Sequence, residues 1–338
     1  LISRIKILSI LKIDEKRLPQ DGRFTFTFGK EEVDLRISTV PTVYGEKVVM
    51  RLLPKGTAAP TLVELGLRGT ALKNFEVQLL RPHGIVLVCG PTGSGKTTTL
   101  YSVLSKVSTT KVNVLTIEDP VEYQIQGVNQ VQVNPGIGLT FASALRSFLR
   151  QDPNIMMVGE VRDTETAELA VQAALTGHQV FSTVHTNSAA GAAPRLLDMG
   201  VEPFLLASAL NAVLGQRVVR KICPNCKVAF SAPPEVVENV RQVLGQLMPT
   251  KVVGQSLTLY RGQGCPKCNK VGYLGRVGIY EVLVVSEKIS NLILNHSTTD
   301  EVEKEGILEG MTTMKQDGYM KVLEGVTTLE EVLRVAQD

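Results

Sequence analysis

The pattern of apolar and polar positions changes early in the chain, and each part predicts different elements. Apolar and basic residues recur at roughly helical spacing over residues 1–12, which predicts a short amphipathic helix. Residues 23–53 alternate with a period of two around a turn at Tyr44 and Gly45, which predicts a small antiparallel sheet. Residues 55–60 contain Gly, Pro and small side chains without periodicity. We therefore expect a linker there and a small α+β domain over residues 1–60.

The next part of the chain alternates between helix-like stretches and continuous apolar runs. The runs lack a polar face, as do strands buried on both sides of a parallel sheet, and they cover residues 84–89, 112–117, 155–158 and 180–184. The helix-like stretches cover residues 61–80, 97–107, 141–150 and 164–175. Strands that alternate with helices predict an α/β domain with a mainly parallel sheet, here over residues 61–338.

The last part of the chain, from about residue 223, is expected to be rich in loops around its two cysteine pairs and to end in helices. Residues 327–330 have the Thr-Thr-Leu-Glu sequence that is typical of a capped helix start.

Composition and charge exclude several classes of protein. With 338 residues, 43% of them apolar and 20% charged, the chain is typical of a globular protein of about two domains. A net charge of +3 is too small to indicate nucleic acid or membrane binding, and the absence of Trp argues against a base-stacking surface. The uncharged run at 203–216 is too short to span a bilayer. Because the chain does not begin with Met and lacks the features of a signal peptide, we interpret it as a fragment.

A phosphate-binding loop is indicated directly after the first buried run. The match to G-x-x-x-x-G-K-[ST] consists of Gly90, Pro91, Thr92, Gly93, Ser94, Gly95, Lys96 and Thr97. Glycines let successive N–H groups point inward at phosphate oxygens, and the following helix adds its positive end. Lys96 would bind the β- and γ-phosphates, and the Thr97 hydroxyl would be a magnesium ligand. Cys89, just before the loop, is expected to be a core residue.

Candidate catalytic side chains follow the other buried runs. Glu118 and Asp119 end one run, before Pro120, and Glu160 follows the next run. Ligands of open α/β sheets bind at the carboxyl ends of strands, so these acids are candidates for activating water and holding magnesium. Ordinary solvated acids at strand ends are the alternative. His185 follows a third run and is a candidate sensor of the terminal phosphate, although a lone His is more often structural.

Four of the five cysteines form two Cys-Pro-x-Cys pairs, Cys223 with Cys226 and Cys265 with Cys268. Two such loops can supply the four thiolates of a closed tetrahedral zinc site. The spacer, residues 227–264, is longer than the roughly 15–20 residues of common zinc ribbons. A redox pair or two disulfides are less favoured alternatives. We therefore expect a tetracysteine zinc-binding subdomain over residues 220–275.

Several longer motifs together resemble the type II/type IV secretion ATPase family. They are GPTGSGKTTTLY, TIEDPVEY, LRQDPNIMMVGEVRDTETA and GHQVFSTVHTN, with the cysteine pairs, LPQDGRF, VDLRIST and GEKVVMRLL near the start, and TTLEEVLRV at the end. The resemblance implies a RecA-like P-loop ATPase domain that binds ATP, Mg²⁺ and Zn²⁺. It further implies a cytoplasmic homohexameric motor at the inner membrane, which it reaches only indirectly through a platform protein and assembly-complex proteins.

The resemblance also assigns residues. Glu118 matches the glutamate of the family's Asp box, Glu160 its Walker B glutamate, and His178 and His185 its His box. Arg23 and Arg36 match arginines of the small domain that reach the nucleotide, and Arg195 and Arg217 are weaker candidates. Asn154 stands where an Asp is usual, which weakens a magnesium role there.

The predicted function is ATP hydrolysis that drives type IV pilus assembly or type II pseudopilus extension, with pilus assembly slightly favoured. Two alternatives stay open at this point. A pilus retraction ATPase would have the same chemistry, but that branch of the family lacks the cysteine pairs. A regulatory module that binds nucleotide without hydrolysis would not need the paired acids Glu118 and Glu160.

Overall fold

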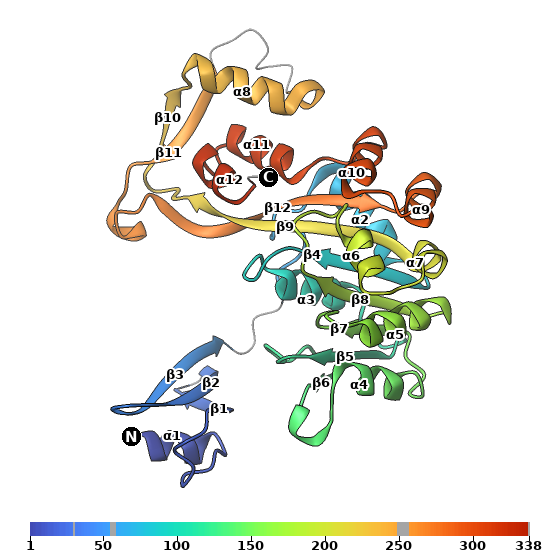
Figure 1. Cartoon of the computed structure of the whole chain (residues 1–338). Coiled ribbons are helices and arrows are strands. Elements are labelled where there is room, and N and C mark those ends of the chain that lie inside the picture. The colour runs from blue at the N-terminus through green and yellow to red at the C-terminus, as the bar shows by residue number, and fades with distance from the viewer. Residues whose placement is uncertain (30, 55–58, 249–256, 337–338) are drawn as a thin grey trace. The chain divides into compact units, whose positions relative to one another are not determined.

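The computed structural model describes residues 1–29, 31–54, 59–248 and 257–336 (Figure 1). The chain forms two compact units. The smaller comprises Leu1–Ala59 with Val121–Gln124, and the larger comprises Pro60–Pro120 with Ile125–Asp338. Most of the predicted linker, residues 55–58, lies outside the described residues. The two units are described separately below.

The smaller unit is a helix followed by a three-stranded antiparallel sheet, as its pattern predicts. It contains α1 (Ile2–Leu8), β1 (Gln20–Phe28), β2 (Glu31–Thr42) and β3 (Gly45–Pro54), in the order β1-β2-β3. The turn between β2 and β3 ends at Gly45, where φ is +120°. Side chains other than that of Gly rarely adopt this conformation, so the tight turn requires Gly45.

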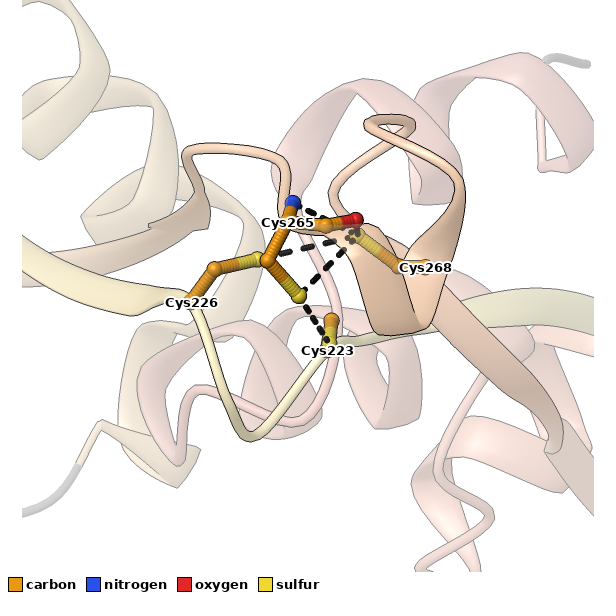
Figure 2. Close-up of side chains that lie close together, drawn as sticks. All are labelled: Cys223, Cys226, Cys265 and Cys268. Atoms are coloured by element: carbon orange, nitrogen blue, oxygen red, sulfur yellow. Dashed lines mark hydrogen bonds between the residues drawn. The ribbon is translucent and has the colours of Figure 1, made fainter.

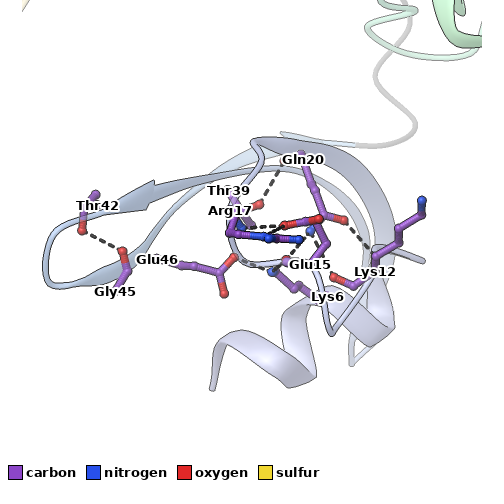
Figure 3. Close-up of polar contacts among 9 residues, drawn as sticks. All are labelled: Lys6, Lys12, Glu15, Arg17, Gln20, Thr39, Thr42, Gly45 and Glu46. Carbon is purple, nitrogen blue, oxygen red and sulfur yellow. Dashed lines mark hydrogen bonds and ion pairs between the residues drawn. The ribbon is translucent and has the colours of Figure 1, made fainter.

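Polar side chains fasten the loop after α1 to this sheet (Figure 3). The buried Lys6 donates to the carbonyl oxygen of Glu15 at 2.7 Å and forms an ion pair with Glu46. The Gln20 side chain accepts from the Lys12 N–H at 2.8 Å and donates to the Lys12 carbonyl at 3.0 Å. A unit this small has little apolar core, so such hydrogen bonds and ion pairs contribute to the stability of its fold.

The larger unit is built on a seven-stranded sheet with the order β12-β9-β4-β8-β7-β5-β6 (Figure 1). The strands are β4 (Gly84–Cys89), β5 (Val114–Glu118), β6 (Asn129–Gln132), β7 (Ile155–Val158), β8 (Gln179–Val184), β9 (Leu210–Ile222) and β12 (Tyr273–Val284). All pairs are parallel except β12 with β9, which are antiparallel. The prediction of a mainly parallel sheet is confirmed.

The helices of this unit cover both faces of the sheet. They are α2 (Gly69–Leu79), α3 (Lys96–Val107), α4 (Phe141–Phe148), α5 (Thr164–Leu175), α6 (Ala192–Asp198), α7 (Pro203–Ala209) and α9 (Glu287–Leu294). Ile85 and Leu87 of β4 join the core formed with α4, α5 and α7, whereas Val86 and Val88 point to the other face. Every residue of β4 is buried, which explains why its sequence is apolar without alternation.

A second core lies around the C-terminal half of β9 and the part of β12 that pairs with it. It joins Val219 and Ile279 of these strands to Tyr319 and Val332 of the C-terminal helices. In the part of the chain that the structure describes, the remaining elements are α8 (Pro234–Leu244), α10 (Thr299–Leu308), α11 (Met314–Leu323), α12 (Leu329–Val335), β10 (Lys227–Ser231), β11 (Thr258–Gly262) and short 3₁₀ helices at Pro135–Ile137, Gly245–Leu247 and Pro266–Cys268. A capped helix start is present, but one residue later than the pattern at 327–330 places it, because the Thr328 side chain accepts from the Glu331 N–H at the start of α12.

Two sequence expectations need correction. The helix predicted over 61–80 begins only at Gly69, because Gly66 has a φ of +103° and the carbonyl of Leu65 bonds to the Gly278 N–H. Sequence analysis also missed two long strands, because β9 was not predicted and the twelve-residue strand β12, which pairs with it, lies in the region where loops and helices were expected. Among the described residues, no helix is long and apolar enough to cross a membrane.

Candidate nucleotide and metal sites

Four predicted site features meet at one edge of the parallel sheet. Gly90 follows β4, Glu118 ends β5, Glu160 follows β7 and His185 follows β8. Parallel strands carry their carboxyl ends to the same edge, which is where open α/β sheets bind ligands. The sheet topology thus gathers residues that are distant in sequence.

The loop between β4 and α3 has the backbone of a phosphate-binding loop. Gly90, Gly93 and Gly95 have φ values of +148°, +81° and +88°, which other residues rarely adopt. Gly95 is the N-cap of α3, so the loop leads directly into a helix N-terminus that favours anions. Along the loop, Ser94 and Lys96 are buried, Gly95 is half-buried, and Pro91, Thr92, Gly93 and Thr97 are exposed.

Lys96 is folded against the loop itself. Its ammonium donates to the carbonyl oxygens of Gly90 at 2.8 Å and Pro91 at 3.1 Å. Burial lowers the pKa of Lys96, and the nearby charge of Glu160 opposes this shift. The two carbonyl oxygens hold the Lys96 amine within the loop, where phosphate oxygens would replace them as acceptors.

Glu118 is held in place by hydrogen bonds and is only 2% exposed. Its carboxylate accepts from the Thr116 hydroxyl at 2.6 Å, the Gln130 amide at 3.1 Å and the Tyr101 hydroxyl. Sequence analysis missed these three supports. Thr116 could have been found, because residues two apart share one face of a strand. Tyr101 and Gln130 come from elements that only the fold brings to β5.

Glu160 and His185 are brought together as a pair. The imidazole Nε2 of His185 lies 3.4 Å from a carboxylate oxygen of Glu160, which also forms an ion pair with Arg162 at 2.5 Å. The Glu160 side chain is 12% exposed and that of His185 is 44% exposed, so both reach the surface of this edge. The arrangement can hold a hydrated cation or contact a terminal phosphate.

Other candidates lie elsewhere. His178 precedes β8 at the opposite edge of the sheet, and its Nδ1 lies 2.9 Å from the Ala173 carbonyl oxygen. Asn154 is also at that edge, where it accepts from the Asn113 N–H at 2.7 Å. Arg217 follows Gln216 on β9 and donates to the Asn187 carbonyl at 2.9 Å, close to the His185 loop. Arg195 lies in α6.

Three arginines of the smaller unit form a row across its sheet. Arg23 of β1 is directly opposite Arg36 of β2, which is directly opposite Arg51 of β3. Directly opposed residues point to the same face, and like charges so placed destabilise a sheet. Arg23 donates to the Val121 carbonyl at 2.6 Å. The row is an anion-binding arrangement in chemical terms, and sequence analysis missed its third member, Arg51.

The four paired cysteines converge between the end of β9 and the start of β12 (Figure 2). All four sulfur atoms lie within 4.8 Å of one another. Three of the pairs, Cys223 with Cys265, Cys226 with Cys268 and Cys265 with Cys268, have Sγ–Sγ distances of 3.8, 3.9 and 3.7 Å. These are not disulfides, and a tetrahedral Zn–S bond of about 2.3 Å requires about 3.8 Å between sulfurs.

The donor set fits zinc by its chemistry as well as its spacing. The Cys268 sulfur accepts from the Cys265 N–H at 3.1 Å and the Gly272 N–H at 3.3 Å. Chiefly through the Cys265 N–H bond, the pKa of Cys268 falls to about 6, which favours its thiolate, whereas burial raises the pKa of Cys226 to about 11. Four thiolates would close the coordination sphere and leave no catalytic position. The fifth cysteine, Cys89, is buried as expected, and burial raises its pKa to about 12.

Comparisons with known proteins agree with these features. Residues 1–334 match the model of the family described as "Type II/IV secretion system protein". The chain is 50% identical to the "Type IV pilus assembly ATPase PilB" of Thermus thermophilus over 98% of its length. It is 49% identical to the "Type II secretion system ATPase E" of Vibrio cholerae over 100% of its length. It spans 37% of the first relative and 65% of the second.

A solved structure shows the same fold. The "Pilus Retraction Motor PilT", with bound ADP, matches with a TM-score of 0.69 and 29% identity, covering 95% of this chain and 78% of that one. The family match covers nearly the whole chain. The parallel sheet and the phosphate-binding loop of this chain are those that the sequence predicted. The chain therefore belongs to the type II/IV secretion system protein family.

Proposed function

We propose that this protein is a motor ATPase that hydrolyses Mg-ATP to drive assembly of a type IV pilus or a type II secretion pseudopilus. The observation that carries the proposal is the phosphate-binding loop and the acids Glu118 and Glu160 at one edge of the sheet. A loop that only binds nucleotide does not need two acids there. The names of the relatives, PilB and the type II ATPase E, support the same activity.

In the proposed mechanism, residues 90–97 bind the phosphates, and the Thr97 hydroxyl and Glu160 would hold Mg²⁺. Glu118 would orient or deprotonate the attacking water. The two roles can be exchanged within the same set of residues. His185, beside Glu160, contacts the terminal phosphate. Magnesium would offset the charge that develops on the transferred phosphoryl group.

The proposed organisation assigns residues 1–60 to a small domain whose Arg23 and Arg36 reach the nucleotide. Residues 61–338 form the ATPase domain, with a zinc-binding subdomain at 220–275. A zinc ion held by Cys223, Cys226, Cys265 and Cys268 would be structural, because four thiolates leave no open position.

The working assembly we propose is a cytoplasmic homohexamer that acts at the inner membrane through a platform protein and other assembly proteins. The tetracysteine cluster supports assembly over retraction, because the retraction branch of the family lacks the cysteine pairs.

A phosphate-release assay on the purified protein tests this proposal. Wild type should release phosphate from Mg-ATP. Lys96→Ala should abolish release, because it removes the charge at the β- and γ-phosphates, while zinc stays near one ion per chain. Turnover retained by Lys96→Ala would contradict the site assignment. A wild-type protein that binds ADP but releases no phosphate would instead favour the regulatory module.

A further inference from the structure

Gln216 lies directly beside the phosphate-binding loop, on a strand that sequence analysis did not assign to the site. Strand β9 runs parallel to β4 with Gly215 opposite Cys89. Gln216 is therefore the first residue beyond the paired part of the strands, next to the point where the loop begins at Gly90. It is 1% exposed.

Gln216 contacts the start and the end of the loop. A Cβ added at Gly90 would lie 2.6 Å from the carbonyl oxygen of Gln216. The side-chain Nε2 of Gln216 donates to the carbonyl oxygen of Ser94 at 2.6 Å. A Cβ added at Gly95 would lie 3.2 Å from the same Nε2. Gln216 thus lies against the loop near its start, at Gly90, and near the helix that follows it, at Ser94 and Gly95.

The side-chain amide of Gln216 uses one of its two polar atoms on the loop. Its Nε2 bonds to the Ser94 carbonyl oxygen, whereas its Oε1 is buried without a hydrogen-bond partner among the described residues, as is the Ser94 hydroxyl oxygen. Gln179 also has a buried Oε1 without a partner, so what distinguishes Gln216 is the bond that its N–H makes to the loop.

We infer that Gln216 is a positioning residue of the phosphate-binding loop. The inference rests on the proposed function and deepens it. By holding the Ser94 carbonyl with its amide N–H, Gln216 turns that peptide so that the loop N–H groups face the phosphates. It contacts no substrate itself and acts through residues 90–95.

This role has a defined kinetic consequence. The loop binds the phosphates in the ground state and in the transition state alike. A disordered loop therefore weakens the binding of the ground state and of the transition state equally. Loss of the Gln216 bond should therefore raise the ADP dissociation constant and the KM for ATP while kcat changes little. Loss of one hydrogen bond to a buried carbonyl corresponds to a dissociation constant for ADP that is about tenfold higher.

The test compares Gln216→Leu with Gln216→Glu by ADP titration and steady-state phosphate release. Leucine keeps the volume and removes the donor. Glutamate keeps the shape but places a carboxylate oxygen against the Ser94 carbonyl, so its loss of affinity should be the larger. The expected order of ADP affinity is wild type, then leucine, then glutamate. If Gln216→Leu does not fold, the test is the ADP affinity of Gln216→Glu compared with that of wild type.

Gln179→Leu is the matched control. Gln179 is also buried, its amide donates to the Gln78 carbonyl at 3.3 Å, and its Oε1 is likewise without a partner. Gln179 lies at the amino end of β8, away from the loop. The Gln179→Leu variant should therefore bind ADP with the affinity of wild type. Zinc content and thermal midpoint are measured for every variant, to separate loop positioning from general destabilisation.

The outcomes are distinct. Normal ADP affinity and KM in both Gln216 variants overturn the inference, and so does a fall in kcat at unchanged ADP affinity, which indicates a contact made only in the transition state. A wild-type protein that neither binds ADP nor releases phosphate overturns the proposed function instead.

Discussion

Single residues of this protein show how burial and hydrogen bonding set the state of a charged group. Glu331 is 2% exposed, and burial alone would raise its pKa. It nevertheless accepts from the Arg220 guanidinium at 2.7 Å, the Arg220 N–H at 2.9 Å and the Arg334 guanidinium at 2.9 Å. These bonds prevail and lower its pKa to about 2. The carboxylate ties α12 to β9.

The low pKa of Glu331 predicts an acid-dependent loss of stability. A lowered folded-state pKa stabilises the protein at pH values above the ordinary 4.5, and the gain is lost as the pH falls from there toward 2. Glu331→Gln should therefore lower the free energy of unfolding at pH 7, by on the order of 3 kcal/mol at most, and flatten its decline in acid. Urea unfolding at a series of pH values measures both effects.

The exposed neighbour Glu330 supplies the control for this prediction, since Glu330→Gln should leave the curve near that of wild type. Equal acid sensitivity in wild type and Glu331→Gln would show that the bonds to Arg220 and Arg334 do not set the pH dependence.

At the scale of elements, two long strands organise the second half of the chain. β9 and β12 pair in antiparallel fashion, and the segment between them carries β10, α8 and β11. Gly215 on β9 faces Glu281 on β12, and a Cβ at Gly215 would lie 2.7 Å from the Glu281 carboxylate. That carboxylate accepts from the Ala189 and Met314 N–H groups at 2.6 and 3.2 Å. The strand pair thus connects the loop after β8 with the start of α11.

The cysteine cluster closes the insertion between these strands, and its removal should act on that segment. We expect Cys265→Ser to lose bound zinc and to make residues 223–272 sensitive to protease, because structural zinc supplies folding free energy. Zinc emission analysis and limited proteolysis measure the two effects. Cys89→Ser is the control, since Cys89 lies outside the cluster and should leave zinc at one ion per chain. Full zinc content in Cys265→Ser would rule out the closed site.

At the scale of the whole molecule, the proposal that Arg23 and Arg36 reach the nucleotide makes a kinetic prediction. If Arg23 and Arg36 stabilise the transferring phosphoryl group, the double variant Arg23→Ala/Arg36→Ala should lose about 10³–10⁵ in kcat and keep its affinity for ADP. Phosphate release and ADP titration distinguish the two quantities.

Arg17→Ala is a suitable control for the arginine row, because the Arg17 side chain lies in the same unit and is 91% exposed. A double variant that hydrolyses ATP at the wild-type rate would remove the smaller unit from the chemistry. The same rate loss in Arg17→Ala would point to general damage to that unit.

Prediction from sequence succeeded where local pattern controls structure. β4, β7 and α5 have the predicted bounds, because continuous apolar runs and capped amphipathic segments specify their own conformation. It failed for β9 and for the start of α2. β9 has no alternation that separates it from a helix, and α2 begins late because Gly66 and the bonds of Leu65 to β12 are tertiary features.

The sequence by itself determined the phosphate-binding loop, the acids at the strand ends and the pairing of four cysteines, because each is a short pattern whose chemistry depends on residue type and spacing. Only the tertiary structure decided which distant residues support them. Tyr101 and Gln130 reach Glu118, and Gln216 reaches the loop, through strand order and register. Strand order depends on packing over the whole sheet, so no local pattern encodes these contacts.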